Sequence, residues 1–171
     1  LRDFGPAALD DLIPRIRVIA ATLDAAHAAG VVHGALHPSK VIITDAATGR
    51  DNIDPDGMKP SLAFVAWNDD EATAAVALPV DLRKLSIRHL AASRSGQVAF
   101  GCQYEGSLEE MPPLLGLADT AGNFRMLSMP ESDLAGMQNY VGSVSMDAGE
   151  EIIAATSPRG GRTAFWNAKT G

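Results

Sequence analysis

Ser86-Ile87-Arg88-His89 is a short stretch that combines residue types suited to chemistry. It brings a hydroxyl, a guanidinium and an imidazole onto one predicted strand. Such groups can face a ligand, or they can tie neighbouring sheets together by hydrogen bonds. We favour the structural role and keep ligand binding as the alternative.

A second group of polar residues is predicted at strand edges or in loops, where ligands and partners usually bind. Gln103-Tyr104 and Asn139-Tyr140 belong to it, and Arg159 lies in a predicted hairpin turn, Ser157–Gly161. That turn offers adjacent glycines that, with Arg162, are suited to cradle an anion. The complete set of ligand-binding candidates is Arg88, His89, Gln103, Tyr104, Asn139, Tyr140 and Arg159.

We predict no catalytic residue, no metal site and no cofactor. His27, His33 and His37 are close in sequence, but zinc usually recruits i, i+4 pairs or cysteines, and Pro38 argues against a helix there. Asn52–Gly57 is similar to the start of a calcium loop, yet Ala63 stands where its closing glutamate belongs. We interpret Cys102 as a buried core residue, and Glu105, Glu109 and Glu110 as a solvated acidic loop.

Charge and hydropathy exclude two classes of partner. The net charge of −7 is opposite to that of a nucleic-acid-binding surface. No apolar run approaches the roughly 18 residues that span a bilayer. The first 50 residues are electrically neutral and the remainder carries the whole negative charge. This asymmetry indicates two segments of different origin, which we place at residues 1–47 and 48–171.

The elements that would position the candidates differ between these segments. Apolar residues at steps of three and four predict an amphipathic helix over residues 10–29, which Gly30 ends. We expect Ile16, Ile19 and Leu23 to pack that helix over Leu62 and Phe64 of the first sheet. Downstream, short apolar strands alternate with Gly, Asp and Asn turns.

The downstream strands repeat with a period near 50 residues. Segments 61–70, 113–123 and 162–171 each read as an apolar strand followed by a polar turn, and 88–103 matches 142–157 as a pair of strands. Such a period indicates β-propeller blades. We therefore predict a mainly β fold, an incomplete β-propeller of about two to three antiparallel blades with an N-terminal α-helical segment, in a piece of a longer protein.

The first segment carries the sequence VVHGALHPSKVIIT. In it, His33, Leu36 and Pro38 match the histidine, leucine and proline of the kinase catalytic loop motif H-R-D-L-K-P-x-N. Residues 8–45 thus resemble the helix and catalytic loop of a degenerate protein kinase. Ala35 replaces the catalytic base and Lys40 the magnesium ligand, so the resemblance implies no kinase activity.

The second segment resembles a known family over several stretches in order: TGRDNIDPDGMKPSLAFV, LRKLSIRHLAASRSGQVAFGCQYEG, PPLLGL, MQNYVGSV and AATSPRGG. It is similar to a bacterial family of unknown function whose members are twin-arginine-exported, WD-repeat-like β-propellers. The genes of that family often lie near those of imelysin-type and iron-uptake proteins. The resemblance implies a periplasmic location, with a cytoplasmic one as the alternative.

These observations lead to a functional expectation. We expect a non-enzymatic propeller fragment that binds an unknown protein partner or small ligand, linked to periplasmic iron uptake. The alternatives are a catalytically dead kinase-like module fused to a propeller, with a signalling or scaffold role in the cytoplasm, and a propeller enzyme such as a lactonase.

Overall fold

The computed structural model describes residues 41–44, 60–65 and 72–171. In these ranges the chain is mostly β, with short helical turns. The elements in chain order are β1 (Val41–Thr44), β2 (Ser61–Val65), β3 (Ala72–Ala77), η2 (Val80–Leu82), β4 (Leu85–Ala92), β5 (Gln97–Tyr104), β6 (Leu115–Asp119), β7 (Phe124–Leu127), α2 (Glu131–Gly136), β8 (Ser143–Met146), β9 (Ile152–Ser157) and β10 (Arg162–Asn167). None of the described helices is long and apolar enough to cross a membrane.

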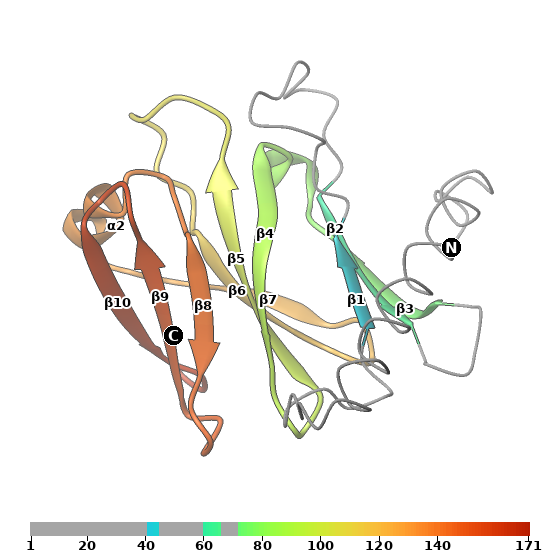
Figure 1. The fold of residues 1–171 in the computed structure, drawn as a ribbon. Coiled ribbons are helices and arrows are strands. Elements are labelled where there is room, and N and C mark those ends of the chain that lie inside the picture. The colour runs from blue at the N-terminus through green and yellow to red at the C-terminus, as the bar shows by residue number, and fades with distance from the viewer. Residues whose placement is uncertain (1–40, 45–59, 66–71) are drawn as a thin grey trace, which may run out of the picture.

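The strands form three antiparallel sheets in which sequence neighbours pair with one another. Sheet I has the order β1-β2-β3, sheet II the order β4-β5-β6-β7 and sheet III the order β8-β9-β10. Figure 1 shows the three sheets side by side in chain order. Consecutive small meanders of this kind are the arrangement of propeller blades, so the predicted mainly β, incomplete propeller is confirmed.

The repeat predicted from the sequence corresponds to equivalent strands. The predicted match of 88–103 with 142–157 as pairs of strands corresponds to β4-β5 and β8-β9, the first antiparallel pairs of their sheets. The polar turns after β6 and β10 also match. The Asp119 carboxylate accepts N–H bonds from Ala121 and Asn123, and the Asn167 side chain accepts from Lys169 and Thr170.

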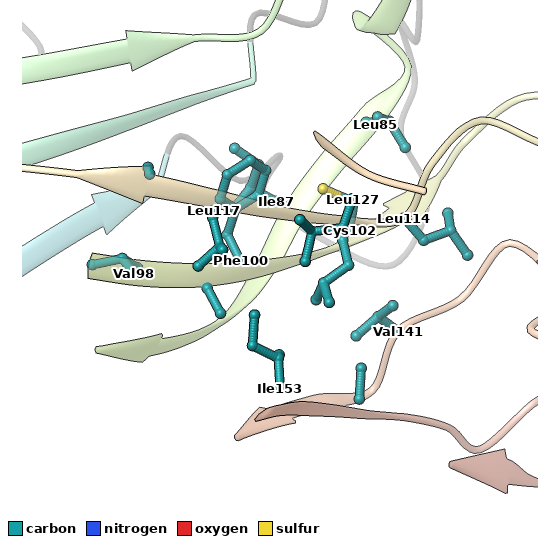
Figure 2. Packing of buried hydrophobic residues seen from close by; sticks show 14 of the residues in the cluster. Leu85, Ile87, Val98, Phe100, Cys102, Leu114, Leu117, Leu127, Val141 and Ile153 are labelled. Atoms are coloured by element: carbon teal, nitrogen blue, oxygen red, sulfur yellow. The ribbon is translucent and has the colours of Figure 1, made fainter. Parts of the chain in front are cut away.

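The sheets share one hydrophobic core. Figure 2 shows Phe100, Cys102 and Ile87 of sheet II in one cluster with Val141 and Ile153 from the region of sheet III. Leu62 and Phe64 of sheet I join the same cluster and are buried. Continuous burial of this kind, across sheets that are too small to be stable alone, is the main stabilising contribution.

Sheets II and III approach very closely where β8 lies against β4 and β5. A Cβ atom on Gly101 would lie 2.6 Å from a methyl of Val144 and would also overlap Val141. A glycine is therefore required at this point of β5 by the space between the sheets. At the other end of β5, the backbone N–H of Ser95 donates to the Glu150 carboxylate at 3.0 Å, which ties the first turns of the two sheets together.

Several predictions fall outside the described residues. These are the helix over 10–29, the kinase-like loop with Ala35 and Lys40, the histidines 27, 33 and 37, and the Asn52–Gly57 loop. β1 precedes the expected boundary near residue 47 and pairs with β2, which follows it. The boundary and the packing of the helix over Leu62 and Phe64 stay predictions.

Candidate functional site

The site begins at a bulge in β4. The pairing of β4 with β5 shifts between Ile87 and His89, so Arg88 lies at the irregularity. Bulges bend a strand and redirect side chains, and they are frequent near binding sites. The Arg88 guanidinium donates to the Ser86 hydroxyl at 2.8 Å and to the Glu105 carboxylate at 3.3 Å. Both hydrogen bonds of Arg88 thus stay within the region of sheet II, whereas the sequence predicted a bond to a neighbouring sheet.

Three polar side chains form a row across the end of sheet II. Ser86 of β4 is opposite Gln103 of β5, and Gln103 is also opposite Tyr140 through an antiparallel bridge. Directly opposite residues of antiparallel strands have side chains on one face, with Cβ atoms about 5 Å apart. We call Ser86, Gln103 and Tyr140 the polar row. Its middle member is fixed because the Gln103 amide donates to the Val141 carbonyl at 3.3 Å.

A cation stands at each end of the polar row. Arg88 bonds to Ser86 at one end, and the Arg159 guanidinium lies over the Tyr140 ring at the other, 4.4 Å from its centre. Arg159 reaches this position because the Ser157–Gly161 segment is the predicted turn, joining β9 to β10. An exposed cation–π contact of this type contributes about 0.5–1 kcal/mol. The contact links sheet III to the row.

Tyr104 and Asn139 support the row from beside it. The Tyr104 backbone N–H donates to the Asn139 carbonyl at 3.0 Å, and the Tyr104 hydroxyl bonds to the Glu110 carboxylate. The buried Asn139 amide donates to the carbonyls of Ser107 and Glu110 at 3.1 and 2.9 Å. Asn139 has a φ of 53°, a left-handed conformation that asparagine tolerates better than most residues. Both residues thus act mainly by holding backbone in place.

Among the seven candidates, His89 is the one that the structure leaves out of these contacts within the described residues. It is half-buried on β4, opposite Gly101. Burial, and to a lesser extent the positive charge of Arg88, lower the pKa of His89 below its ordinary value of 6.5. The imidazole is therefore neutral at pH 7 and does not add to the cations of the row.

Two interpretations of acidic and glycine-rich segments need correction. Glu105 is half-buried in an ion pair with Arg88, whereas Glu109 and Glu110 are exposed as expected. The Ser157–Gly161 turn does not point Arg159 and Arg162 at one anion. Arg159 stacks on Tyr140, while Arg162 lies against Gly136 and faces Asp133 at 4.0 Å, because the turn residues diverge toward different neighbours.

An open groove of about 520 Å³ runs along β10, and the glycines and Arg162 of the predicted Ser157–Gly161 turn region form one part of its lining. Its walls include Arg162, Phe165 and Trp166 of β10 and the segment Ser128–Pro130. The Trp166 indole N–H donates to the Ser128 carbonyl at 3.0 Å and so fixes one wall. The groove forms because β10 packs beside Ser128–Pro130, a segment that lies almost 40 residues earlier in the chain. None of the seven candidates lines it.

Two observations concern the thiol and the possible metal ligands in the part of the chain that the structure describes. Cys102 is fully buried on β5, and burial raises the pKa of its thiol far above the ordinary value. This agrees with the predicted role of Cys102 as a core residue. In the described ranges, no three His, Cys, Asp or Glu side chains gather closely enough to hold a metal ion.

Comparison with known proteins places the chain in a family. The model of a protein family of unknown function, DUF1513, matches residues 41–171. The chain belongs to this family, and the resemblance to a family of unknown function is confirmed. The match begins at β1. No similarity to a curated protein is found.

Among solved structures, the chain is similar to the crystal structure of the β-propeller domain of Cps50 (Swd1) from Myceliophteria thermophila. The two sequences are 20% identical and superpose with a TM-score of 0.43. The alignment covers 66% of this chain and 32% of the other, so the chain spans about a third of the length of that domain.

Proposed function

We propose that this DUF1513 chain is a non-enzymatic, propeller-type binding scaffold whose ligand or partner docks on the polar row and its two flanking arginines. The observation that carries the proposal is the convergence of six of the seven candidates, from segments up to 71 residues apart, at one end of sheets II and III. Tyr and Arg are the residue types that dominate binding energy at protein surfaces. Rigid placement lowers the entropy that binding costs.

The structural arrangement of each member favours recognition of a polar group. Gln103 supplies a half-buried amide, the buried Ser86 hydroxyl holds Arg88 in place, and Arg159 is exposed although it lies on an aromatic ring. Arg88 is already paired with Glu105, so Arg159 is the cation with the larger remaining capacity to meet a ligand. A ligand with an acidic or carbonyl oxygen group beside an apolar or aromatic part fits this arrangement best.

The finer part of the proposal concerns the setting. We propose a role in periplasmic iron uptake, which rests on the family resemblance of residues 48–171. Ferric citrate and a ferric hydroxamate siderophore are consequently the first ligands to test, because both present oxygen-rich anionic surfaces. Cell fractionation of the native host, with growth at low and high iron, tests the location and the iron link directly.

A thermal-shift panel on the whole chain tests the binding function. The probes are the two ferric complexes, a set of dicarboxylates, and Mg-ATP as the ligand expected of an active kinase. A ligand at ten times its Kd adds about 1.4 kcal/mol of stability, which raises the Tm of a protein of this size by roughly 3–6 °C. We expect such a rise with a ferric or carboxylate probe and none with Mg-ATP.

Variants locate the binding. Tyr140→Ala and Arg159→Ala should abolish the rise, while Thr163→Ala, an exposed residue of β10, should leave it intact. The proposal is wrong if no probe of the panel stabilises the chain, or if the stabilisation persists in both Tyr140→Ala and Arg159→Ala. Turnover of a lactone or phosphate ester that depends on a polar-row residue would contradict the non-enzymatic assignment.

A further inference from the structure

The loop between β5 and β6 is longer than its equivalent in sheet III. It comprises residues 105–114, whereas β9 and β10, the corresponding second and third strands, are joined by residues 158–161. The turns between β4 and β5 and between β6 and β7 are equally short. Sheet II therefore carries an insertion at a point where a four-residue turn is sufficient to connect the strands.

The insertion is held in one conformation. At its start, the Glu105 N–H donates to the Lys84 carbonyl at 2.9 Å. In its middle, the Asn139 amide donates to two carbonyls, those of Ser107 and Glu110. Pro112-Pro113 stiffen its end, since proline fixes φ. These contacts mean that little further conformational entropy is lost when a partner binds this loop.

Although it is held, the loop turns apolar side chains outward. Residues 107–111 are all exposed, and within them Leu108 is 71% and Met111 39% accessible. A single exposed apolar residue has no special meaning, but here two of them fall within one five-residue segment whose backbone is held in place. Glu109 and Glu110 lie between them. Figure 1 shows the loop projecting beyond the strands at one end of sheet II.

We propose that residues 107–111 dock a cationic polypeptide segment, with Leu108 and Met111 as the apolar anchors and Glu109 as the charged neighbour that selects basic partners. The charge argument is twofold: the anchors enclose two carboxylates, and the chain has a net charge of −7. Like charge would repel an acidic segment from the same surface. This inference rests on the proposed binding function and names the partner class for the loop beside the polar row.

Selection from a displayed library of random twelve-residue peptides against the whole immobilised chain provides the probe. Enriched peptides are then synthesised, and their Kd is measured by fluorescence anisotropy. We expect sequences with Lys or Arg beside an apolar residue, and an affinity that falls as salt rises. We also expect Leu108→Ser/Met111→Ser to weaken binding at least tenfold. Both side chains are exposed, so the double variant should keep its stability.

Matched controls separate the loop from general surface effects. Val80→Ser removes an apolar side chain that is 75% exposed, similar to Leu108, and should leave the Kd unchanged. Glu109→Gln should weaken binding about three- to fivefold, as loss of one surface charge pair does. Glu131→Gln removes an exposed carboxylate of α2 and should leave the Kd of the peptide unchanged.

Three outcomes overturn the inference. The first is a selection that enriches no peptide, or only acidic or neutral peptides. The second is a peptide Kd that is unchanged in Leu108→Ser/Met111→Ser. The third is a dimer in sedimentation that dissociates in this double variant, because a second copy of the chain would then be the occupant. Peptides whose binding is lost in Tyr140→Ala but not in Leu108→Ser/Met111→Ser would refute the loop while leaving the proposed function standing.

Discussion

A single methyl group added at Gly101 should force sheets II and III apart. The new Cβ would lie 2.4 Å from a Val141 methyl and 2.6 Å from a Val144 methyl, while ordinary carbon contacts begin at 3.4 Å, so the sheets must separate by about 1 Å or β5 must distort. Overpacking of this kind costs about 1–3 kcal/mol. For a chain of 171 residues, a cost near 2 kcal/mol lowers the Tm by roughly 4–8 °C.

Calorimetry or circular dichroism measures that loss, and a double-mutant cycle assigns it to the sheet interface. Gly101→Ala should cost about 1 kcal/mol less in a Val141→Ala/Val144→Ala background than in the wild-type chain, because both methyl groups that the new Cβ would meet are then absent. Ser145→Ala, at an exposed position of β8, is the control and should change stability little. An unchanged Tm in Gly101→Ala, or strict additivity in the cycle, would refute the packing of the two sheets through this point.

Two further outcomes follow from titratable groups. The Asp147 carboxylate accepts N–H bonds first from Ile152 and Glu151 and then from Gly149, which lowers its pKa below the ordinary 3.8. Because the folded pKa is depressed, the carboxylate stabilises the fold above pH 3.8, and this stabilisation is lost as the pH falls below that value. Asp147→Asn should therefore have a lower free energy of unfolding than wild type at pH 7, and the two proteins should become equally stable in acid. The buried thiol of Cys102, whose pKa is raised, should not react with a disulfide reagent at pH 8 in the native chain, but one thiol should react in guanidinium; fast native reaction would show that the β5 core is open.

Local patterns predicted most of the fold because a blade is built from neighbours in sequence. Alternating apolar residues and Gly, Asp or Asn turns specify the hairpins 85–104 and 140–157, and each sheet is a simple meander. The closeness of the sheets at Gly101 could not be predicted, because it depends on which sheet faces overlap. The helix expected over residues 10–29 stays a prediction.

The site was less accessible from the sequence. The residue types of the polar row are visible, but the pairing of Gln103 with Tyr140 joins positions 37 residues apart across a strand end. The bulge that places Arg88 has no sequence signature. The role of Asn139 in holding the β5–β6 loop depends on burial and a positive φ, which only the tertiary structure shows.

The most direct test of the account is a disulfide across the polar row. Gln103 and Tyr140 are bridge partners, so cysteines at these positions have the separation that a disulfide needs. In a Cys102→Ala background, mild oxidation of Gln103→Cys/Tyr140→Cys should leave no free thiol after denaturation. Ser95→Cys/Gln103→Cys, separated by the length of β5, roughly 20 Å, should keep both thiols free. Two free thiols in the first variant would show that the candidate residues do not meet, and the proposed site would not exist.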